Sequence, residues 1–356
     1  MQLAYGTVQR VRPLDHAIET LGRRPVRKLD PPVRAALRLG AYQLAYMGSV
    51  PVHAAANESV ELVRAAGLER AVAFTNAVMR RLAEGIVPLL DALDDSTPAE
   101  AALKHSYPDW IAATWWREWG REDALGLMQA QNEPPETAVR TPEGPLVVDE
   151  IPSGWVEEGR AWPQSRGLQL AGAAVGARPG ERILDLCAAP GGKATQLAET
   201  AAEVVAVEIH PGRTRELEAN AARLGAANVR VVQADALELP AEHRGFDRVI
   251  VDAPCSGLGV LNSRPDLRWR AQPLPELQVA LLRTALERVK PGGSVTYSVC
   301  TVHGLENEDV IDAIGAQAED LGAGFPDYRH PRRPEFLLTL PHVHGTAGFF
   351  VARLRA

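Results

Sequence analysis

Apolar residues recur at helical spacing through the first part of the chain. In "LDPPVRAALRLGAYQLAYM" they return every three or four residues, at Val33, Leu37, Ala41 and Leu44. Asp30 stands where an N-cap is expected, and two prolines follow it in the first turn. "VHAAANESVELVRAAG" predicts a second helix ending at Gly67, and "ERAVAFTNAVMRRLAEG" a third ending at Gly85. No strand pattern interrupts these runs, so residues 1–85 are predicted to form a small all-helical bundle.

From residue 178 onward the pattern changes to short apolar runs that alternate with helical ones. The runs "RILDLC", "EVVAVE", "VRVVQ", "DRVIVDA" and "GSVTYSV" are rich in β-branched residues. Helical stretches such as "GRTRELEANAARLG" and "LPELQVALLRTALERVK" separate them, and "GFFVARL" predicts one more strand. This alternation predicts an α/β domain, in which a parallel sheet carries helices on both faces. We therefore expect three parts, at residues 1–88, 89–170 and 171–356.

Composition and charge narrow the class of protein. Apolar residues make up 46% of the chain, and no apolar run is long enough to span a membrane. Three widely spaced cysteines do not form a disulfide framework, which favours reduced thiols and a cytoplasmic location. The net charge of −7 divides into +5 over residues 1–84 and −12 over the remainder. The basic front part is compatible with RNA contact, although a solvated helical surface explains it as well.

The stretch "ILDLCAAPGGKATQLAE" predicts a strand, a turn of small residues and a helix. It is neither the glycine pattern of dinucleotide-binding proteins nor a P-loop, and a tight turn without a ligand is the alternative. Acidic residues mark the ends of four successive predicted strands: Asp185, Glu208, Asp235 and Asp252. Ligands of open α/β sheets lie at these ends. Each carboxylate alone could be a surface cap, but together they describe a nucleoside site without a polyphosphate, which fits S-adenosylmethionine better than NAD or ATP.

Two of the three thiols also stand at predicted strand ends. Cys187 is predicted to lie inside a strand as a small buried hydrophobe. Cys255 in "VDAPCSGLG" and Cys300 in "YSVCTV" both fall where the methyl donor is expected. Carbon 5 of cytosine is a poor nucleophile until a thiolate adds to carbon 6, so such thiols suit covalent catalysis on a base that has left its stack. Asp252 is placed to stabilise charge near ring nitrogen 3.

The motifs "LDLCAAPGGKATQLA", "DAPCSGLGVLNSRPDLRW" and "YSVCTVHGLENEDV" together resemble the RNA cytosine-5 methyltransferases of the NOL1/NOP2/Sun family, and within it the bacterial RsmB or Sun branch. The front part, with "LRLGAYQLAYMGSVPVHAAANESVELVR", resembles the NusB-like RNA-binding domain of that branch, and "NEPPETAVRTP" its short middle subdomain. The resemblance implies a class I (Rossmann-like) methyltransferase domain behind an all-α NusB-like domain. The substrate it implies is 16S rRNA. The alternatives are tRNA or another RNA, or an RNA-binding assembly or termination factor with a non-catalytic methyltransferase half.

The same resemblance assigns roles to individual residues. Cys300 is the nucleophile, Cys255 acts in product release, and Asp252 contacts the cytosine and the amino-acid end of the cofactor. Glu208 and Asp235 contact ribose and adenine. The cofactor loop consists of Cys187, Ala188, Ala189, Pro190, Gly191, Gly192 and Lys193. A helix-surface role is the alternative for Lys193.

Three features depart from the family pattern. The NusB-like part begins at a point well inside that domain, so its first helix or two are expected to be missing. Ser165 stands where an acidic residue is expected, and Ala347 stands where an aspartate usually precedes Gly-Phe-Phe. Neither a metal nor a membrane is expected, and a monomer is the simplest prediction.

Overall fold

The computed structural model describes residues 2–356. The chain divides into two compact units, Met1–Asn132 and Glu133–Ala356. Each unit is described by itself. The boundaries expected at residues 88 and 170 stay a prediction. No helix among residues 2–356 is both long enough and apolar enough to cross a bilayer.

The first unit is helical, as its apolar spacing predicts. The three predicted helices are α3 (Pro31–Tyr46), α4 (Val52–Ala65) and α5 (Glu69–Asp91). Two helices come before them, α1 (Gln2–Gln9) and α2 (Val11–Gly22), and two follow, α6 (Pro98–His105) and α7 (Asp109–Ala130). The prediction of an all-helical front part is therefore confirmed.

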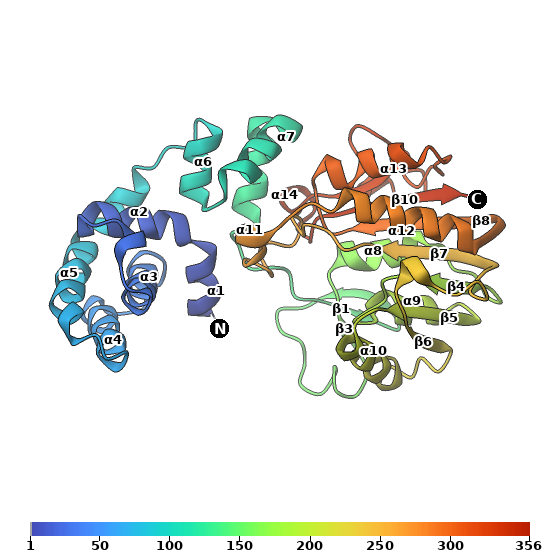
Figure 1. Ribbon diagram of the computed structural model, residues 1–356, viewed down its shortest axis with the longest axis horizontal. Helices are drawn as coiled ribbons and strands as arrows, with labels where there is room; N and C mark the ends of the chain where they lie inside the picture. The colour runs from blue at the N-terminus through green and yellow to red at the C-terminus, as the bar shows by residue number, and fades with distance from the viewer. Residues whose placement is uncertain (1) are drawn as a thin grey trace. The chain divides into compact units, whose positions relative to one another are not determined.

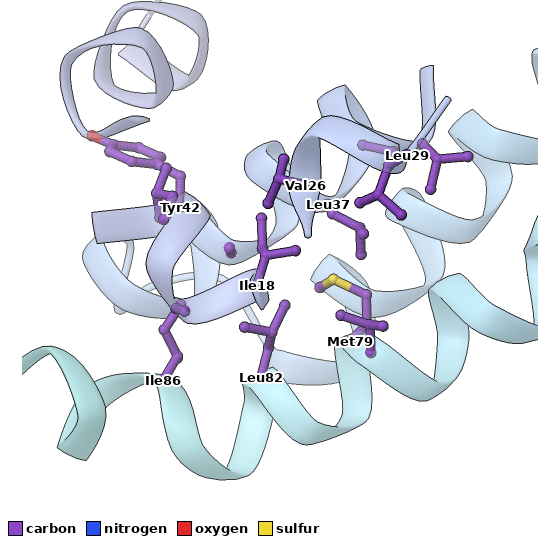
Figure 2. Close-up of a cluster of buried hydrophobic side chains, with 14 of the residues drawn as sticks. Ile18, Val26, Leu29, Leu37, Tyr42, Met79, Leu82 and Ile86 are labelled. Carbon is purple, nitrogen blue, oxygen red and sulfur yellow. The ribbon is translucent and has the colours of Figure 1, made fainter. Parts of the chain in front are cut away.

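Apolar side chains from α2, α3 and α5 form the core of this unit. Ile18, Leu37 and Leu82 come from these three helices in turn, and at most 1% of each is exposed. Figure 2 shows them with Met79 and Ile86 pointing into one shared cluster. Each helix contributes residues three or four positions apart, so one stripe of each faces the others.

One local expectation in this unit is wrong and one is confirmed. The helix predicted to end at Gly85 continues to Asp91, because Ile86, Leu89 and Leu90 also pack on the core and outweigh the glycine. Asp30 occupies the N-cap position of α3 as expected, although its side chain makes no capping hydrogen bond. It forms a 3.4 Å ion pair with Arg70 instead.

The second unit is built on a seven-stranded sheet. In chain order its strands are β4 (Arg182–Asp185), β5 (Glu203–Glu208), β6 (Val229–Gln233), β7 (Phe246–Asp252), β8 (Val289–Val299), β9 (Leu337–Thr339) and β10 (Phe349–Arg355). They lie side by side in the order β6-β5-β4-β7-β8-β10-β9, and Figure 1 labels all of them except β9. The first five are parallel, as expected. The predicted last strand, β10, is antiparallel to both β8 and β9, so the sheet is mixed.

Helices connect and cover these strands. They are α8 (Arg166–Ala174), α9 (Gly192–Ala198), α10 (Pro211–Arg223), α11 (Leu267–Arg270), α12 (Pro275–Arg288), α13 (Glu308–Ile314) and α14 (Pro341–His344). α9 packs on β4 and β5, α10 on β5 and β6, and α12 on β7 and β8. This is the Rossmann-like arrangement expected for the methyltransferase domain. It brings the carboxyl ends of five parallel strands to one edge.

A small antiparallel sheet precedes the large one in the chain. It contains β1 (Ala138–Thr141), β2 (Gly144–Val147) and β3 (Trp162–Pro163), in the order β2-β1-β3. Ser165, one of the departures from the family pattern, caps α8: its hydroxyl accepts a hydrogen bond from the Leu168 amide at 3.3 Å. The serine thus has a local structural role.

Candidate active site at the carboxyl edge of the sheet

A cavity of about 600 Å³ lies at the carboxyl ends of the parallel strands. The structure brings seven of the predicted site residues to its wall: Cys187, Ala189, Glu208, Asp235, Asp252, Cys255 and Cys300. These residues lie at the ends of β4, β5, β6, β7 and β8 or in the loops that follow them, which are far apart in the sequence. The other five predicted residues, Ala188, Pro190, Gly191, Gly192 and Lys193, are not among the residues that line the cavity.

The loop after β4 turns sharply into α9. Gly191 has a φ of 111°, which a residue with a side chain rarely adopts, and its amide donates to the Ala188 carbonyl at 2.8 Å. Gly192 is the first residue of α9, whereas Pro190 is exposed. Cys187 lies two residues beyond the end of β4, so the expectation that it sits inside the strand is wrong. Burial raises the pKa of its thiol, which keeps Cys187 protonated.

Two carboxylates that line the cavity are held by local backbone amides. Glu208 is 5% exposed and accepts from the His210 amide at 2.8 Å, and Arg213 lies 3.5 Å from its other oxygen. Asp235 accepts from the Leu237 amide at 2.9 Å and caps the turn Ala236–Glu238. The cap role considered for Asp235 is therefore present, and its side chain also faces the cavity.

Asp185 differs from the other three strand-end carboxylates. It is fully buried and is not among the residues that line the cavity. One oxygen accepts from the Cys187 amide at 3.2 Å, while the other has no hydrogen-bond partner. Burial raises the pKa of this carboxyl group to about 7. Only three of the four carboxylates therefore face the cavity.

Asp252 is fixed by two donors from other elements. The Lys193 ammonium lies 2.6 Å from Oδ2, and the Ser298 hydroxyl donates to Oδ1 at 2.8 Å. Lys193 is 5% exposed, so the helix-surface alternative for it is wrong. A buried ammonium needs a charged partner, and Asp252 supplies it. The pair ties the start of α9 to the end of β7.

The two strand-end thiols meet at the cavity. The sulfur of Cys255, in the loop after β7, lies 3.4 Å from the sulfur of Cys300, which follows β8. The hydrogen bond with Cys300, together with burial, holds the pKa of the Cys255 thiol well above its usual range. Cys255 therefore keeps its proton and can donate it towards the Cys300 sulfur. The backbone adds a further link, because the Gly259 amide donates to the Cys300 carbonyl at 3.0 Å.

Sequence reasoning missed two supporting residues. Ser298 precedes Cys300 by two positions at the end of β8, so strand alternation could have placed both on one side of the sheet. Glu306 is fully buried and accepts hydrogen bonds from Ser256, the residue after Cys255. These two residues are fifty positions apart, and no local pattern indicates that they meet.

The residues at this edge fit the expected cofactor. A nucleoside needs hydrogen-bond acceptors for its hydroxyl and amino groups, and the Glu208 and Asp235 side chains supply them at the cavity wall. Carboxylates around the cavity suit a cationic sulfonium and not a polyphosphate. S-adenosylmethionine therefore matches the hydrogen-bond acceptors at the cavity wall.

Comparisons with known proteins agree with this architecture. A family model described as 16S rRNA methyltransferase RsmB/F matches residues 173–355, and a NusB family model matches residues 1–84. Ribosomal RNA small subunit methyltransferase B from Thermus thermophilus is 34% identical, over 99% of this chain and 87% of that protein.

Two solved structures extend the comparison. The crystal structure of PH0851 covers 100% of this chain and 89% of its own, with a TM-score of 0.83 at 22% identity, which indicates a shared fold. The crystal structure of NSun6 from Pyrococcus horikoshii with SFG is 31% identical, with a TM-score of 0.51 over 60% of this chain and 59% of that one.

Proposed function

This chain belongs to the RsmB/F family of 16S rRNA methyltransferases, and from that premise we propose that it methylates carbon 5 of a cytosine in 16S rRNA through a covalent bond to Cys300. S-adenosylmethionine is the cofactor of this family, and it supplies an electrophilic methyl group. The observation that carries the proposal is the meeting of Cys300, Cys255 and Asp252 at one cavity. A methyltransferase that acts on an already nucleophilic atom needs no pair of thiols at that place.

The residues proposed to hold the cofactor surround one part of the cavity. Glu208 accepts from the ribose hydroxyls and Asp235 from the adenine amino group, because both carboxylates face the cavity. The loop from Cys187 to Lys193 lets the backbone come close to the cofactor, because Gly191 and Gly192 at its turn carry no side chain. Lys193 acts by holding Asp252, which we place against the cytosine and the amino-acid end of the cofactor.

Cys300 begins the proposed reaction by adding its sulfur to carbon 6 of the cytosine. The new S–C6 bond pushes the electrons of the C5–C6 double bond onto carbon 5, which becomes enamine-like and able to accept a methyl group. As the sulfur adds, ring nitrogen 3 takes up a proton from solvent, and the Asp252 carboxylate accepts a hydrogen bond from this N–H group. Lys193 and Ser298 hold one oxygen of Asp252 each, so its carboxylate is oriented before the base arrives.

Cys255 acts in the second half of the reaction. The proton on carbon 5 leaves, its electrons restore the C5–C6 double bond, and the S–C6 bond breaks to free Cys300. The hydrogen bond with Cys300 is the largest cause that raises the pKa of Cys255. Once the Cys300 sulfur is bonded to carbon 6 it is a poorer hydrogen-bond acceptor for the Cys255 proton, so that proton can pass to solvent. The Cys255 sulfur is then the base that takes the proton from carbon 5.

Replacing each thiol separately tests this division of labour. Cys255→Ala is expected to accumulate a denaturation-resistant protein–RNA adduct, because the S–C6 bond forms but is released slowly. Cys300→Ala is expected to give neither adduct nor methylation, while cofactor binding persists in a calorimetric titration. Denaturing gels with labelled 16S rRNA fragments measure the adduct. An adduct in Cys300→Ala, or none in Cys255→Ala, would contradict the assignment.

The RNA substrate is tested in cells. Bisulfite sequencing compares ribosomal and transfer RNA from cells with and without the gene. Cells without the gene are expected to lack one 5-methylcytosine in 16S rRNA. Loss from tRNA would retain the chemistry and change the substrate. No loss in any RNA would favour an assembly or termination factor with a non-catalytic half.

We propose that residues 1–88 contribute RNA binding, because the NusB family model matches residues 1–84. Residues 89–170 are proposed to be a linker and a small RNA-binding subdomain, and residues 171–356 the catalytic domain.

A further inference from the structure

Glu306 is a fully buried carboxylate at the end of the turn Gly304–Glu306, which follows β8. It does not line the cavity, so it cannot touch the cytosine or the cofactor there. Its side chain accepts from the Ser256 amide at 2.9 Å, the Leu274 amide at 3.1 Å and the Gln278 side-chain amide at 2.9 Å. The Ser256 hydroxyl donates to its other oxygen. Every one of these partners is a donor.

This donor set explains why the position carries a carboxylate. An ionised carboxylate has acceptor sites only, whereas a glutamine would turn an NH₂ group towards at least one of the donors. Burying a charge is costly unless hydrogen bonds satisfy it. A neutral residue of the same size would avoid that cost, so the retained charge indicates that these particular bonds matter to this part of the molecule.

The bonds of Glu306 join the two segments that carry the thiols. Ser256 follows Cys255, and its hydroxyl also lies 3.1 Å from the Thr301 hydroxyl, next to Cys300. The Gln278 amide that donates to Glu306 also contacts the Pro254 carbonyl, at 2.9 Å. Pro254 and Ser256 are therefore held on both sides of Cys255.

The link to the strand of Cys300 runs through the backbone of Glu306. The Tyr297 hydroxyl of β8 donates to the Glu306 carbonyl at 2.6 Å. The same residue thus contacts the Cys255 loop with its side chain and the Cys300 strand with its main chain. We infer that Glu306 is a positioning residue that fixes the Cys255 sulfur against the Cys300 sulfur, by clasping the loop after β7 to the end of β8.

The catalytic consequence rests on the proposed function, but the geometry can be tested without RNA. Diamide takes two hydrogens from a pair of neighbouring thiols, becoming a hydrazine as the thiols become a disulfide. The rate at which Cys255 and Cys300 are joined therefore reports how often their sulfurs meet. In the wild type, peptide mass spectrometry is expected to find this disulfide, with Cys187 left reduced.

Glu306→Gln is the test variant, and Glu308→Gln is its matched control. Glu308 is also buried, but it pairs with His330 at 3.0 Å and Arg332 at 2.9 Å, away from both thiol segments. Glu306→Gln is expected to slow disulfide formation about tenfold, and to slow single-turnover methylation about 100-fold with little change in the KM for RNA, because small misplacements of reacting groups are costly. Glu308→Gln is expected to keep both rates, even where its melting temperature falls.

The outcomes separate the two proposals. An unchanged or faster disulfide rate in folded Glu306→Gln would overturn the positioning role. A wild type that forms the disulfide but methylates no RNA would instead overturn the proposed function. If Glu306→Gln does not fold, Ser256→Ala removes one hydroxyl donor and leaves the backbone amide. Its disulfide rate is then expected to fall by a smaller factor, and a wild-type rate would overturn the role.

Discussion

The core of the helical unit and the carboxyl edge of the sheet bury very different chemistry. The helical core is a continuous apolar cluster drawn mainly from α2, α3 and α5 (Figure 2). The sheet edge buries charged groups: Asp185 and Glu306 are 0% exposed, and Lys193 and Glu208 are 5% exposed. A domain of this size has enough apolar residues to fill its interior without such groups.

The difference separates two reasons for burying a side chain. Burial of apolar area stabilises the fold by roughly 25 cal/mol per Å², so the helical core needs no further explanation. Burial of a carboxylate or ammonium lowers stability unless each charge is paired. Charged groups buried at the sheet edge therefore indicate a role in chemistry or in positioning. We expect a substitution that removes buried apolar area to lower the free energy of unfolding, and one that removes an unpaired buried charge to raise it.

The largest effect is expected in the helical core. Leu82 of α5 is fully buried in the core that α5 shares with α2 and α3. Leu82→Ala leaves a cavity that costs about 3 kcal/mol of unfolding free energy. Calorimetry of the full chain measures the loss. Affinity for S-adenosylmethionine is expected to stay at the wild-type value, since the cavity at the sheet edge lies in the other unit. If Leu82→Ala also lowered the affinity for S-adenosylmethionine, the contrast between the helical core and the sheet edge would fail.

A substitution at the sheet edge is expected to act in the opposite direction. The pKa of Asp185 is about 7, above its ordinary value of 3.8, because burial disfavours the ionised form. The folded protein thus holds this proton more tightly than the unfolded chain. Stability from this group is complete below about pH 4 and falls as the pH rises towards 7. Asp185→Asn cannot ionise, so it is expected to be more stable than the wild type at pH 8. We expect a gain of about 2 kcal/mol, half of the roughly 4 kcal/mol that the full pKa shift represents, because the buried amide brings an NH₂ group without a partner.

Urea unfolding at pH 4.5 and pH 8 measures this difference. The gain from Asp185→Asn should be present at the higher pH and largely absent at the lower one. A variant that is less stable than the wild type at pH 8 would show that the Asp185 carboxylate supports the fold, and the contrast between the two regions would fail.

The smallest effect is expected for an ion pair of the helical unit. Arg38 on α3 contacts Asp15 on α2 through two hydrogen bonds, at 2.7 and 2.6 Å, and about a quarter of each side chain is exposed. Because solvent screens such pairs, Asp15→Asn is expected to cost about 0.5–1 kcal/mol. Salt titration of the unfolding free energy provides the check, since the cost should shrink as salt rises. A cost near that of Leu82→Ala would contradict the view that apolar packing dominates this unit.

Much of the fold follows from local patterns. Helical spacing located α3, α4 and α5, and β-branched runs located the five parallel strands. The end of α5 was missed because burial of Leu89 and Leu90 is a tertiary effect. The direction of β10 was also beyond local pattern, because strand alternation reads the same in both directions.

The candidate site, like the fold, could be predicted from the sequence only in part. Its strand-end residues could be predicted because parallel strands bring their carboxyl ends to one edge, and seven of them line the cavity. The pairing of Lys193 with Asp252 and of Glu306 with Ser256 could not be predicted. Each joins residues fifty or more positions apart, and only the fold determines which loop meets which.

The backbone crossing next to the thiols has a consequence for redesign. Gly348, just before β10, donates its amide to the Gly259 carbonyl at 2.8 Å, and Gly259 in turn donates to the Cys300 carbonyl. A Cβ on Gly259 would collide with the Gly348 carbonyl, so these two segments of the chain touch where no side chain fits. A library aimed at another RNA should therefore keep both glycines.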